Sequence, residues 1–182
     1  MATRLYDEAW IADVVDRLAD EIIADRMPGQ GLAVVGLQTR GAVLAARLVE
    51  GLAGKQRDAE LGTLDITPYR DDLHTGAGLK PIKASDMNFD LNDRNVVLVD
   101  DVMCTGRTIR AAMDALFDYG RPACVRLLVM LDRGGRELPI RPDFVGATVD
   151  VPKGGFVRLK LSEVDALGDA VFLLGSGDEE PE

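Results

Sequence analysis

The stretch NVVLVDDVMCTGRT, at residues 95–108, decides the predicted fold class. Its run from Val96 to Val99 is continuously apolar, which is typical of a strand buried on both faces. A polar loop containing Gly106 follows, and residues 109–120 have the composition of a helix that ends at a glycine. The stretch therefore predicts a strand, a loop and a helix in direct succession.

The same succession occurs earlier in the chain. Residues 32–36 form a short apolar run, the polar loop 38–41 follows, and residues 42–52 favour a helix. Another continuous apolar strand is expected at residues 124–131. Because strands that alternate with helices form parallel sheets, the sequence predicts a doubly wound α/β fold, with helices on both faces of a mostly parallel sheet.

The remaining segments extend this fold within one predicted domain, residues 1–174. Apolar residues at helical spacing predict an amphipathic helix over residues 7–26. Residues 67–92 are polar and have no clear period, so we expect a functional or mobile loop there. Residues 175–182 are expected to form an acidic, disordered tail. Shorter strands are expected at 61–66, 144–149 and 156–161.

Composition excludes several classes of protein. The 182 residues include 21 Lys and Arg against 31 Asp and Glu, and the net charge of −10 argues against nonspecific binding of nucleic acid. Cys104 and Cys124 are the only cysteines and His74 is the only histidine, so the ligand spacings of a structural zinc site are missing. The sequence has no signal-peptide pattern and no run of about 18 apolar residues. We therefore expect a cytoplasmic protein.

The loop at residues 100–108 carries the chemistry. In an open parallel sheet, ligands bind at the carboxyl ends of strands, where this loop is expected. Thr105, Gly106 and Thr108 offer two hydroxyl groups and a closely curling backbone at the start of a helix, which suits a phosphate. The Walker pattern and the dinucleotide-binding glycine pattern are both absent. The loop therefore predicts a phosphate site without the usual triphosphate machinery.

Two carboxylates, Asp100 and Asp101, stand at the start of this loop. Their oxygens suit the paired hydroxyl groups of a ribose, because each can accept a hydrogen bond from an OH. An alternative stays open from the residues alone: the two acids end a strand and Thr105 caps a helix, as in receiver-type or flavodoxin-like domains.

The segment VVLVDDVMCTGRT, residues 96–108, closely resembles the phosphoribosyl-diphosphate (PRPP) motif of type I phosphoribosyltransferases. Three further segments, which begin at Val35, Leu64 and Leu131, together resemble the PyrR family of pyrimidine-operon regulators with uracil phosphoribosyltransferase activity. The resemblance implies the type I phosphoribosyltransferase fold, with a flexible hood loop at about residues 67–92. It also implies that uracil and PRPP react to give UMP and pyrophosphate, with Mg²⁺ on the diphosphate.

This resemblance implies the roles of individual residues. Catalytic roles fall to Asp100, Asp101 and Arg40, and Thr39, Arg40 and Gly41 are expected to bind the diphosphate. Arg133 and the backbone near Val157 are expected at the base. The predicted substrate-binding residues that follow the two acids form one segment: Val102, Met103, Cys104, Thr105, Gly106, Arg107 and Thr108.

The resemblance also implies a leader-RNA partner, bound by a basic face of a homodimer or larger homo-oligomer. Residues 121–141 contain five arginines against two acids, a net charge of +3, and we expect Arg136 and Arg141 to contact RNA. The first helix argues against this partner, because Asp16 and Asp20 stand where such regulators usually have Thr and His.

Two other positions depart from the family pattern. Gly135 replaces a usual histidine, and Cys104 replaces a usual aromatic residue. Two alternative functions stay open. One is an RNA-binding transcription attenuator with little catalysis. The other is a phosphoribosyltransferase for another base, such as a purine or orotate, because the PRPP motif does not identify the base.

Overall fold

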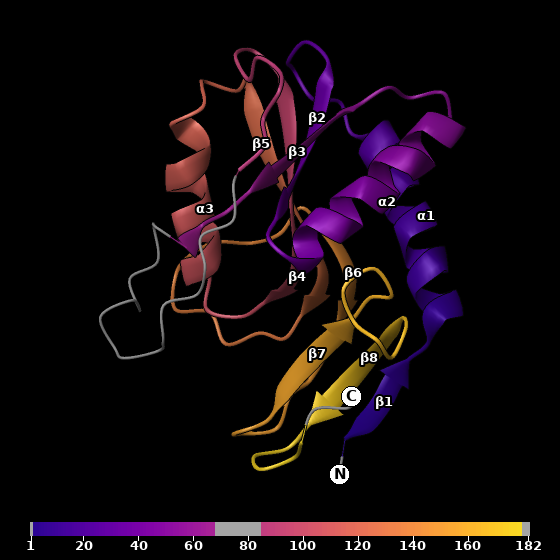
Figure 1. Cartoon of the computed structure of the whole chain (residues 1–182). Helices are drawn as coiled ribbons and strands as arrows, with labels where there is room; N and C mark the ends of the chain where they lie inside the picture. Colours follow the sequence, from indigo (N-terminus) through magenta and orange to yellow (C-terminus); the bar gives the residue numbers. More distant parts are fainter. Residues whose placement is uncertain (1, 68–84, 180–182) are drawn as a thin grey trace.

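The structure is a computed structural model and describes residues 2–67 and 85–179 (Figure 1). Its larger sheet has five parallel strands in the order β3-β2-β4-β5-β6. Their bounds are Leu32–Leu37 for β2, Glu60–Leu64 for β3, Asn95–Met103 for β4, Cys124–Asp132 for β5 and Phe144–Thr148 for β6. The predicted doubly wound α/β fold is confirmed.

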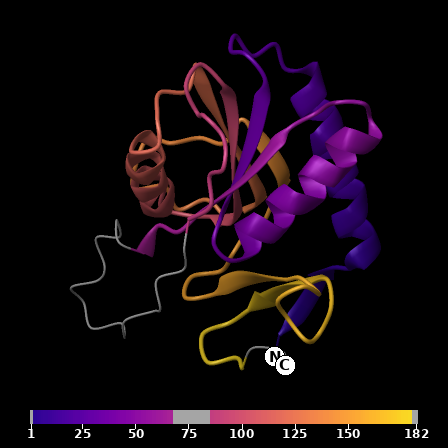
Figure 2. The ribbon, with the colours of Figure 1, turned by 45° about the horizontal axis from the view of Figure 1, so that its top comes forward.

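Helices cover both faces of this sheet (Figures 1 and 2). Helices α1 (Glu8–Ala24) and α2 (Arg40–Gly54) lie on one face, and α3 (Arg107–Phe117) lies on the other. The buried strand residues alternate accordingly: Val97 and Val99 belong to the cluster under α1 and α2, while Val96 and Leu98 belong to the cluster under α3. A strand buried on both faces explains the uninterrupted apolar run in the sequence.

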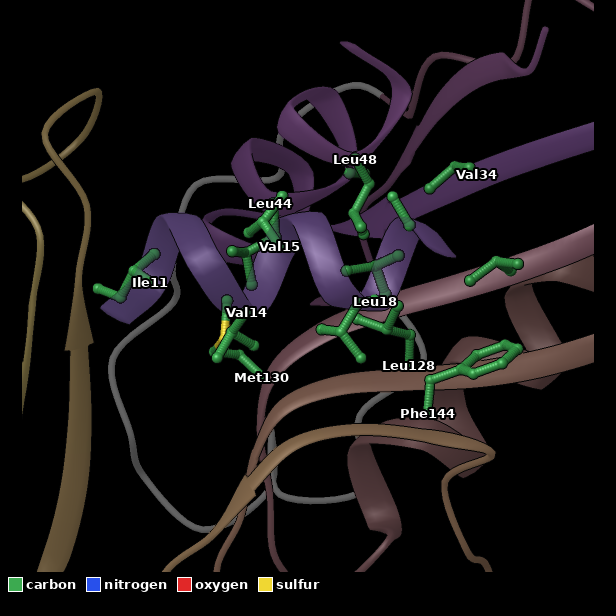
Figure 3. Packing of buried hydrophobic residues seen from close by; sticks show 14 of the residues in the cluster. Ile11, Val14, Val15, Leu18, Val34, Leu44, Leu48, Leu128, Met130 and Phe144 are labelled. Carbon is green, nitrogen blue, oxygen red and sulfur yellow. The ribbon is translucent and has the colours of Figure 1, made fainter. Parts of the chain in front are cut away.

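The cluster under α1 and α2 is the larger part of the core (Figure 3). Helical spacing brings Ile11, Val14, Val15 and Leu18 to one face of α1, as the sequence predicts. They meet residues of α2 and of three strands, namely Leu44, Leu48, Val34, Leu128, Met130 and Phe144. The core thus fixes α2, the helix that begins directly after β2, against the sheet.

The strand order creates one switch point, between β2 and β4. The chain leaves β2 for α2 on one face, and it leaves β4 for α3 on the opposite face. The two loops therefore diverge at the carboxyl edge of the sheet, which is where doubly wound folds bind ligands.

A second sheet, with the order β1-β8-β7, is antiparallel and was not predicted. It joins β1 (Thr3–Tyr6), β7 (Phe156–Lys160) and β8 (Ala170–Leu174). The predicted strand at 156–161 exists, but it pairs here and not in the parallel sheet. The other two strands are short, and β1 pairs with β8 across almost the whole chain, for example Thr3 with Leu173. Local sequence pattern carries no sign of such a distant partner.

One predicted boundary needs correction, and two further predicted segments are described in part. Strand β4 continues through Asp100 and Asp101 to Met103, so the phosphate loop begins at Cys104. Within the loop expected at 67–92, residues 85–92 are held against β3, since Thr63 and Asp86 form an antiparallel bridge and Leu91 is buried; residues 68–84 lie outside the described residues. In the expected disordered tail, the Gly175 N–H donates to Asp178 Oδ2 at 2.9 Å and closes a turn.

No helix within the described ranges is both long and apolar enough to cross a membrane.

Arg47 of α2 joins the small sheet to the rest of the molecule. Its guanidinium donates to Glu163 Oε1 at 2.8 Å and to Asp169 Oδ1 at 2.9 Å, both in the connection between β7 and β8. The bonds from Arg47 are the main cause that lowers the pKa of Asp169, whose side chain is 6% exposed, and of Glu163. The pKa of Arg47 is raised in turn, chiefly by its bond to Asp169.

We expect Arg47→Met to reduce the free energy of unfolding by about 2 kcal/mol at pH 7, because a buried carboxylate loses its partner. The carboxylate pKa values are lowered by folding, so this stabilisation is complete above about pH 4.3 and is lost as the pH falls further. Urea denaturation of the wild type and the variant, at pH 7 and at about pH 3, measures the difference in the free energy of unfolding at each pH.

The matched control for this prediction is Arg110→Met. Arg110 forms an exposed ion pair with Asp114 one turn along α3, and its loss should cost about 0.5 kcal/mol or less. A difference between wild type and Arg47→Met that stays constant down to pH 3 would contradict the assignment.

Candidate active site

Two glycines bring the β2–α2 loop against the end of β4. A Cβ atom on Gly36 would lie 2.3 Å from the carbonyl oxygen of Gly41, and one on Gly41 would lie 2.5 Å from the carbonyl oxygen of Val99. The same atom on Gly41 would be 3.3 Å from the Cα of Asp100. No side chain fits in either place. The start of α2 therefore packs directly on the main chain that carries the two predicted acids.

Asp100 and Asp101 end the central strand and are oriented by the main chain that follows each of them. The N–H of Asp101 donates to Asp100 Oδ1 at 2.9 Å, and the N–H of Val102 donates to Asp101 Oδ1 at 2.9 Å. Asp100 is 7% exposed, whereas Asp101 is half-buried. A carboxylate has about four acceptor positions, so the single bond to Asp101 Oδ1 is compatible with further bonds from ligand hydroxyl groups to Asp101.

The loop after β4 turns at Gly106, where φ is 92°. This left-handed conformation favours glycine, and a Cβ there would also touch Leu138 and Ile140, at 3.4 Å and 3.6 Å. Helix α3 then begins at Arg107 without a side-chain cap from Gly106. N–H groups at a helix N-terminus favour an anion, so this turn is compatible with the predicted phosphate cradle, which stays a prediction.

Thr105 also caps the helix that follows it, as the alternative interpretation of this loop expects. Its Oγ1 accepts the N–H of Arg107 at 3.3 Å, and its carbonyl oxygen accepts the N–H groups of Glu137 and Leu138, each at 3.0 Å. Thr105 therefore holds the turn together, and it does so at the place where a phosphate would bind. Arg107 is exposed and donates from Nε to Glu137 Oε2 at 2.7 Å.

Arg136 stabilises this loop from outside. Its guanidinium donates to the carbonyl oxygen of Cys104 at 2.7 Å, to that of Ile140 at 3.0 Å and to Asp132 Oδ2 at 2.6 Å. The sequence predicts Arg136 as an RNA contact. In the structure, one of its three bonds holds the predicted phosphate loop at Cys104, and the other two join Asp132 and Ile140 of the segment after β5. Arg141, the other predicted RNA contact, is exposed.

The predicted base-binding residues come from two different sides. The N–H of Arg133 donates to the carbonyl oxygen of Met103 at 3.0 Å, which ties Arg133 to the end of β4. Val157 lies in β7, is 6% exposed and belongs to the hydrophobic cluster against which Val102 packs. The small sheet is thus the element that brings Val157 to the same region.

Arg40 lies at the first position of α2, between Thr39 and Gly41. Its Nε and Nη2 donate to the two carboxylate oxygens of Asp165, at 3.0 Å and 2.6 Å. Burial by itself would raise the pKa of Asp165, but the bonds from Arg40 and from the N–H of Leu161 outweigh it and the pKa is lowered. Sequence analysis missed Asp165, because nothing local connects it with a residue 125 positions away.

Within residues 2–67 and 85–179, no group of three His, Cys, Asp or Glu side chains is placed to hold a metal ion. Asp100 and Asp101 still fit Mg²⁺, because this ion usually binds through one or two carboxylates together with substrate phosphates.

Comparison with known proteins agrees with this geometry. The family model described as the phosphoribosyl transferase domain matches residues 1–157. A bifunctional protein PyrR from a Roseiflexus species is 47% identical over 173 residues, covering 94% of each chain. That of Akkermansia muciniphila is 45% identical over 168 residues, covering 92% of this chain and 94% of the relative.

Solved structures share the fold at lower sequence identity. A hypoxanthine-guanine phosphoribosyltransferase from Bacillus anthracis has a TM-score of 0.72 at 20% identity and covers 94% of this chain and 97% of its own. The hypoxanthine phosphoribosyltransferase of Trypanosoma cruzi has a TM-score of 0.70 at 19% identity, with coverage of 95% and 96%. The chain belongs to the phosphoribosyltransferases and, within them, to the PyrR family.

Proposed function

We propose that the protein transfers the phosphoribosyl group of PRPP to uracil, giving UMP and pyrophosphate, and that it also regulates pyrimidine biosynthesis genes in response to UMP. The observation that carries the proposal is the contact of Gly41 with the end of β4, which sets two anion-binding loops on either side of two carboxylates. PRPP has that same order of groups: a phosphate, a ribose with two hydroxyls, and a diphosphate.

Each part of PRPP then has a site of suitable chemistry. The 5′-phosphate binds at the turn Thr105 to Thr108, on the N–H groups that open α3. The ribose hydroxyls donate to Asp100 and Asp101. The diphosphate binds at Thr39 to Gly41, where α2 begins and where the absence of a side chain on Gly41 lets the ligand approach the backbone.

The reaction needs no covalent nucleophile. As the bond from C1′ to the diphosphate oxygen breaks, positive charge develops on the ribose and negative charge on the leaving group. In this proposal the two carboxylates at the end of β4 face the ribose, and Arg40 at the start of α2 faces the leaving group. The protein therefore works by positioning the reactants and by placing charges that match those of the transition state.

Mg²⁺ would supply further neutralisation of the diphosphate, and we propose Asp100 and Asp101 as the side chains that face it. Arg133 and the backbone at Val157 are proposed to recognise uracil from the two sides described above. We also propose that the protein works in the cytoplasm as a homodimer or larger homo-oligomer; the free thiols of Cys104 and Cys124 are consistent with a reducing compartment.

A regulatory role requires binding of a pyrimidine-leader RNA. Some exposed charges of the protein favour this binding and others oppose it. Arg141 is exposed and available for a phosphate. Asp16 and Asp20 of α1, however, are exposed carboxylates that share one cation: Lys55 Nζ, at the end of α2, lies 2.9 Å from Asp16 Oδ1 and 2.8 Å from Asp20 Oδ1. That surface remains net negative and repels phosphates, and we therefore propose that RNA contacts avoid α1.

The first test measures product formation from PRPP with a set of different bases. We expect Mg²⁺-dependent formation of UMP from uracil and PRPP, with far lower product formation from cytosine, orotate, hypoxanthine and guanine. Preference for a purine or orotate would establish the alternative transferase. Binding of UMP without product from any base would leave the protein as a ligand-sensing attenuator.

Asp101→Asn should reduce kcat/KM for PRPP by about 100-fold, because the ribose and the developing positive charge lose a carboxylate. The amide oxygen can still accept the N–H of Val102, so the thermal midpoint should change little. Initial rates of UMP formation and thermal denaturation measure both effects. Asp114→Asn, in an exposed ion pair of α3, is the control and should keep full activity. Unchanged PRPP kinetics in Asp101→Asn would refute the assignment of the ribose site.

For the regulatory role, we expect binding of a pyrimidine-leader hairpin that is strengthened by UMP and weakens steeply with salt. Arg141→Ala should lower the affinity and reduce the slope of log K against log salt by about 1. Arg110→Ala, on an exposed face of α3, serves as the control. Filter binding over a salt series measures the slope, and the absence of any tightening by UMP would count against a UMP-responsive regulator.

A further inference from the structure

Asp165 lies in the connection between β7 and β8 and is bonded on several sides. It accepts both bonds from Arg40, and its Oδ2 also accepts the N–H of Leu161 at 2.9 Å. Its own N–H donates to the carbonyl oxygen of Leu161 at 2.7 Å, which closes a tight turn. Its side chain is 7% exposed. Such a carboxylate is held in one orientation and fixes the plane of the guanidinium bound to it.

A second cation faces the same carboxylate. Lys160 Nζ lies 3.5 Å from Asp165 Oδ1, and its side chain is 12% exposed. Arg40 and Lys160 come from different elements, α2 and β7, and Asp165 stands between them. Without the negative charge of Asp165, these two largely buried cations would repel each other.

The connection that carries Asp165 is anchored independently of Arg40. Arg47, two turns further along α2, binds Glu163 and Asp169, which lie on either side of Asp165 in the sequence. The position of Asp165 relative to α2 is therefore fixed even while the bonds to Arg40 change. This separates the bonds that hold the connection from the bonds that orient Arg40.

We propose that Asp165 is a positioning residue for the reaction: it holds the Arg40 guanidinium at the mouth of the β2–α2 loop, in the orientation that receives the diphosphate. The inference rests on the proposed function, because it assigns Arg40 to the diphosphate side of the PRPP site. In this arrangement Asp165 stays in place when the ligand binds, since its burial and its bonds to the 161–165 turn do not depend on the ligand.

The test compares Asp165→Asn with Glu163→Gln, which removes a charge from the same connection but contacts Arg47 instead of Arg40. We expect Asp165→Asn to raise the KM for PRPP and the Kd for pyrophosphate with Mg²⁺ by about tenfold, because the guanidinium loses its fixed orientation. The KM for uracil should change by less than about twofold. Glu163→Gln should leave all three values near those of the wild type.

Comparing the KM for PRPP with the KM for uracil separates a positioning role of Asp165 from a general structural role. The small sheet carries Val157 on the proposed base side, so a merely structural effect of Asp165 would raise the KM for uracil as well. A double-mutant cycle adds a second criterion: in an Arg40→Ala background, Asp165→Asn should have no further effect on pyrophosphate binding. Where Asp165→Asn fails to fold, Asp165→Glu replaces it, because glutamate keeps the charge but shifts the carboxylate that orients the guanidinium; the same rise in KM for PRPP is expected.

Any one of four results would overturn the inference. A lower KM for PRPP in Asp165→Asn would mean that Asp165 competes with the diphosphate for Arg40. Equal rises in the KM values for uracil and PRPP would mean a structural role, as would an undiminished effect in the Arg40→Ala background. Calorimetry with pyrophosphate keeps the two proposals apart: a wild type that makes no UMP refutes the proposed function, whereas a wild type and an Asp165→Asn variant that bind pyrophosphate equally refute only the role of Asp165.

Discussion

The packing of Gly41 on the main chain of Val99 and Asp100 is the constraint on which the site depends. It permits no side chain, and it sets the start of α2 beside the carboxylates that end β4. The strand order also matters, because the helices after β2 and β4 leave on opposite faces of the sheet and their loops diverge at this edge. Two helix N-termini and two acids thus meet at one edge although they are about 60 residues apart in the chain.

Helix α2 links that edge to the small sheet. Its apolar face, with Leu44 and Leu48, packs into the core under α1, while Arg40 and Arg47 bind carboxylates of the β7–β8 connection. The helix that presents the proposed diphosphate loop therefore also carries the sheet that contains Val157. Because the pKa values of Asp165 and Asp169 are lowered, these ion pairs stay charged at neutral pH and the link is maintained there.

The arginines between residues 121 and 141 show how charge in a sequence differs from charge on a surface. Their number suggested a basic face for RNA. Arg136, however, is bonded to the phosphate loop, and Arg126 donates to Asp25 at 2.7 Å at the far end of the sheet. Only tertiary partners reveal which cations remain for a ligand, since a guanidinium satisfied by internal carbonyl and carboxylate groups is already oriented and partly neutralised.

The sequence by itself determined the doubly wound fold and the strand, turn and helix that contain Asp100 to Thr108, because buried strands, helix faces and a glycine turn are local patterns that side-chain geometry imposes. It also placed Thr39 to Gly41 and Arg133 at their loops through family resemblance. Only the tertiary structure decided the pairing of β1 with β8, the bonds from Arg136 to Cys104 and Asp132, and the bond between Arg40 and Asp165. These are contacts between distant or irregular segments, and no local period records which carboxylate a given arginine will meet once the chain has closed.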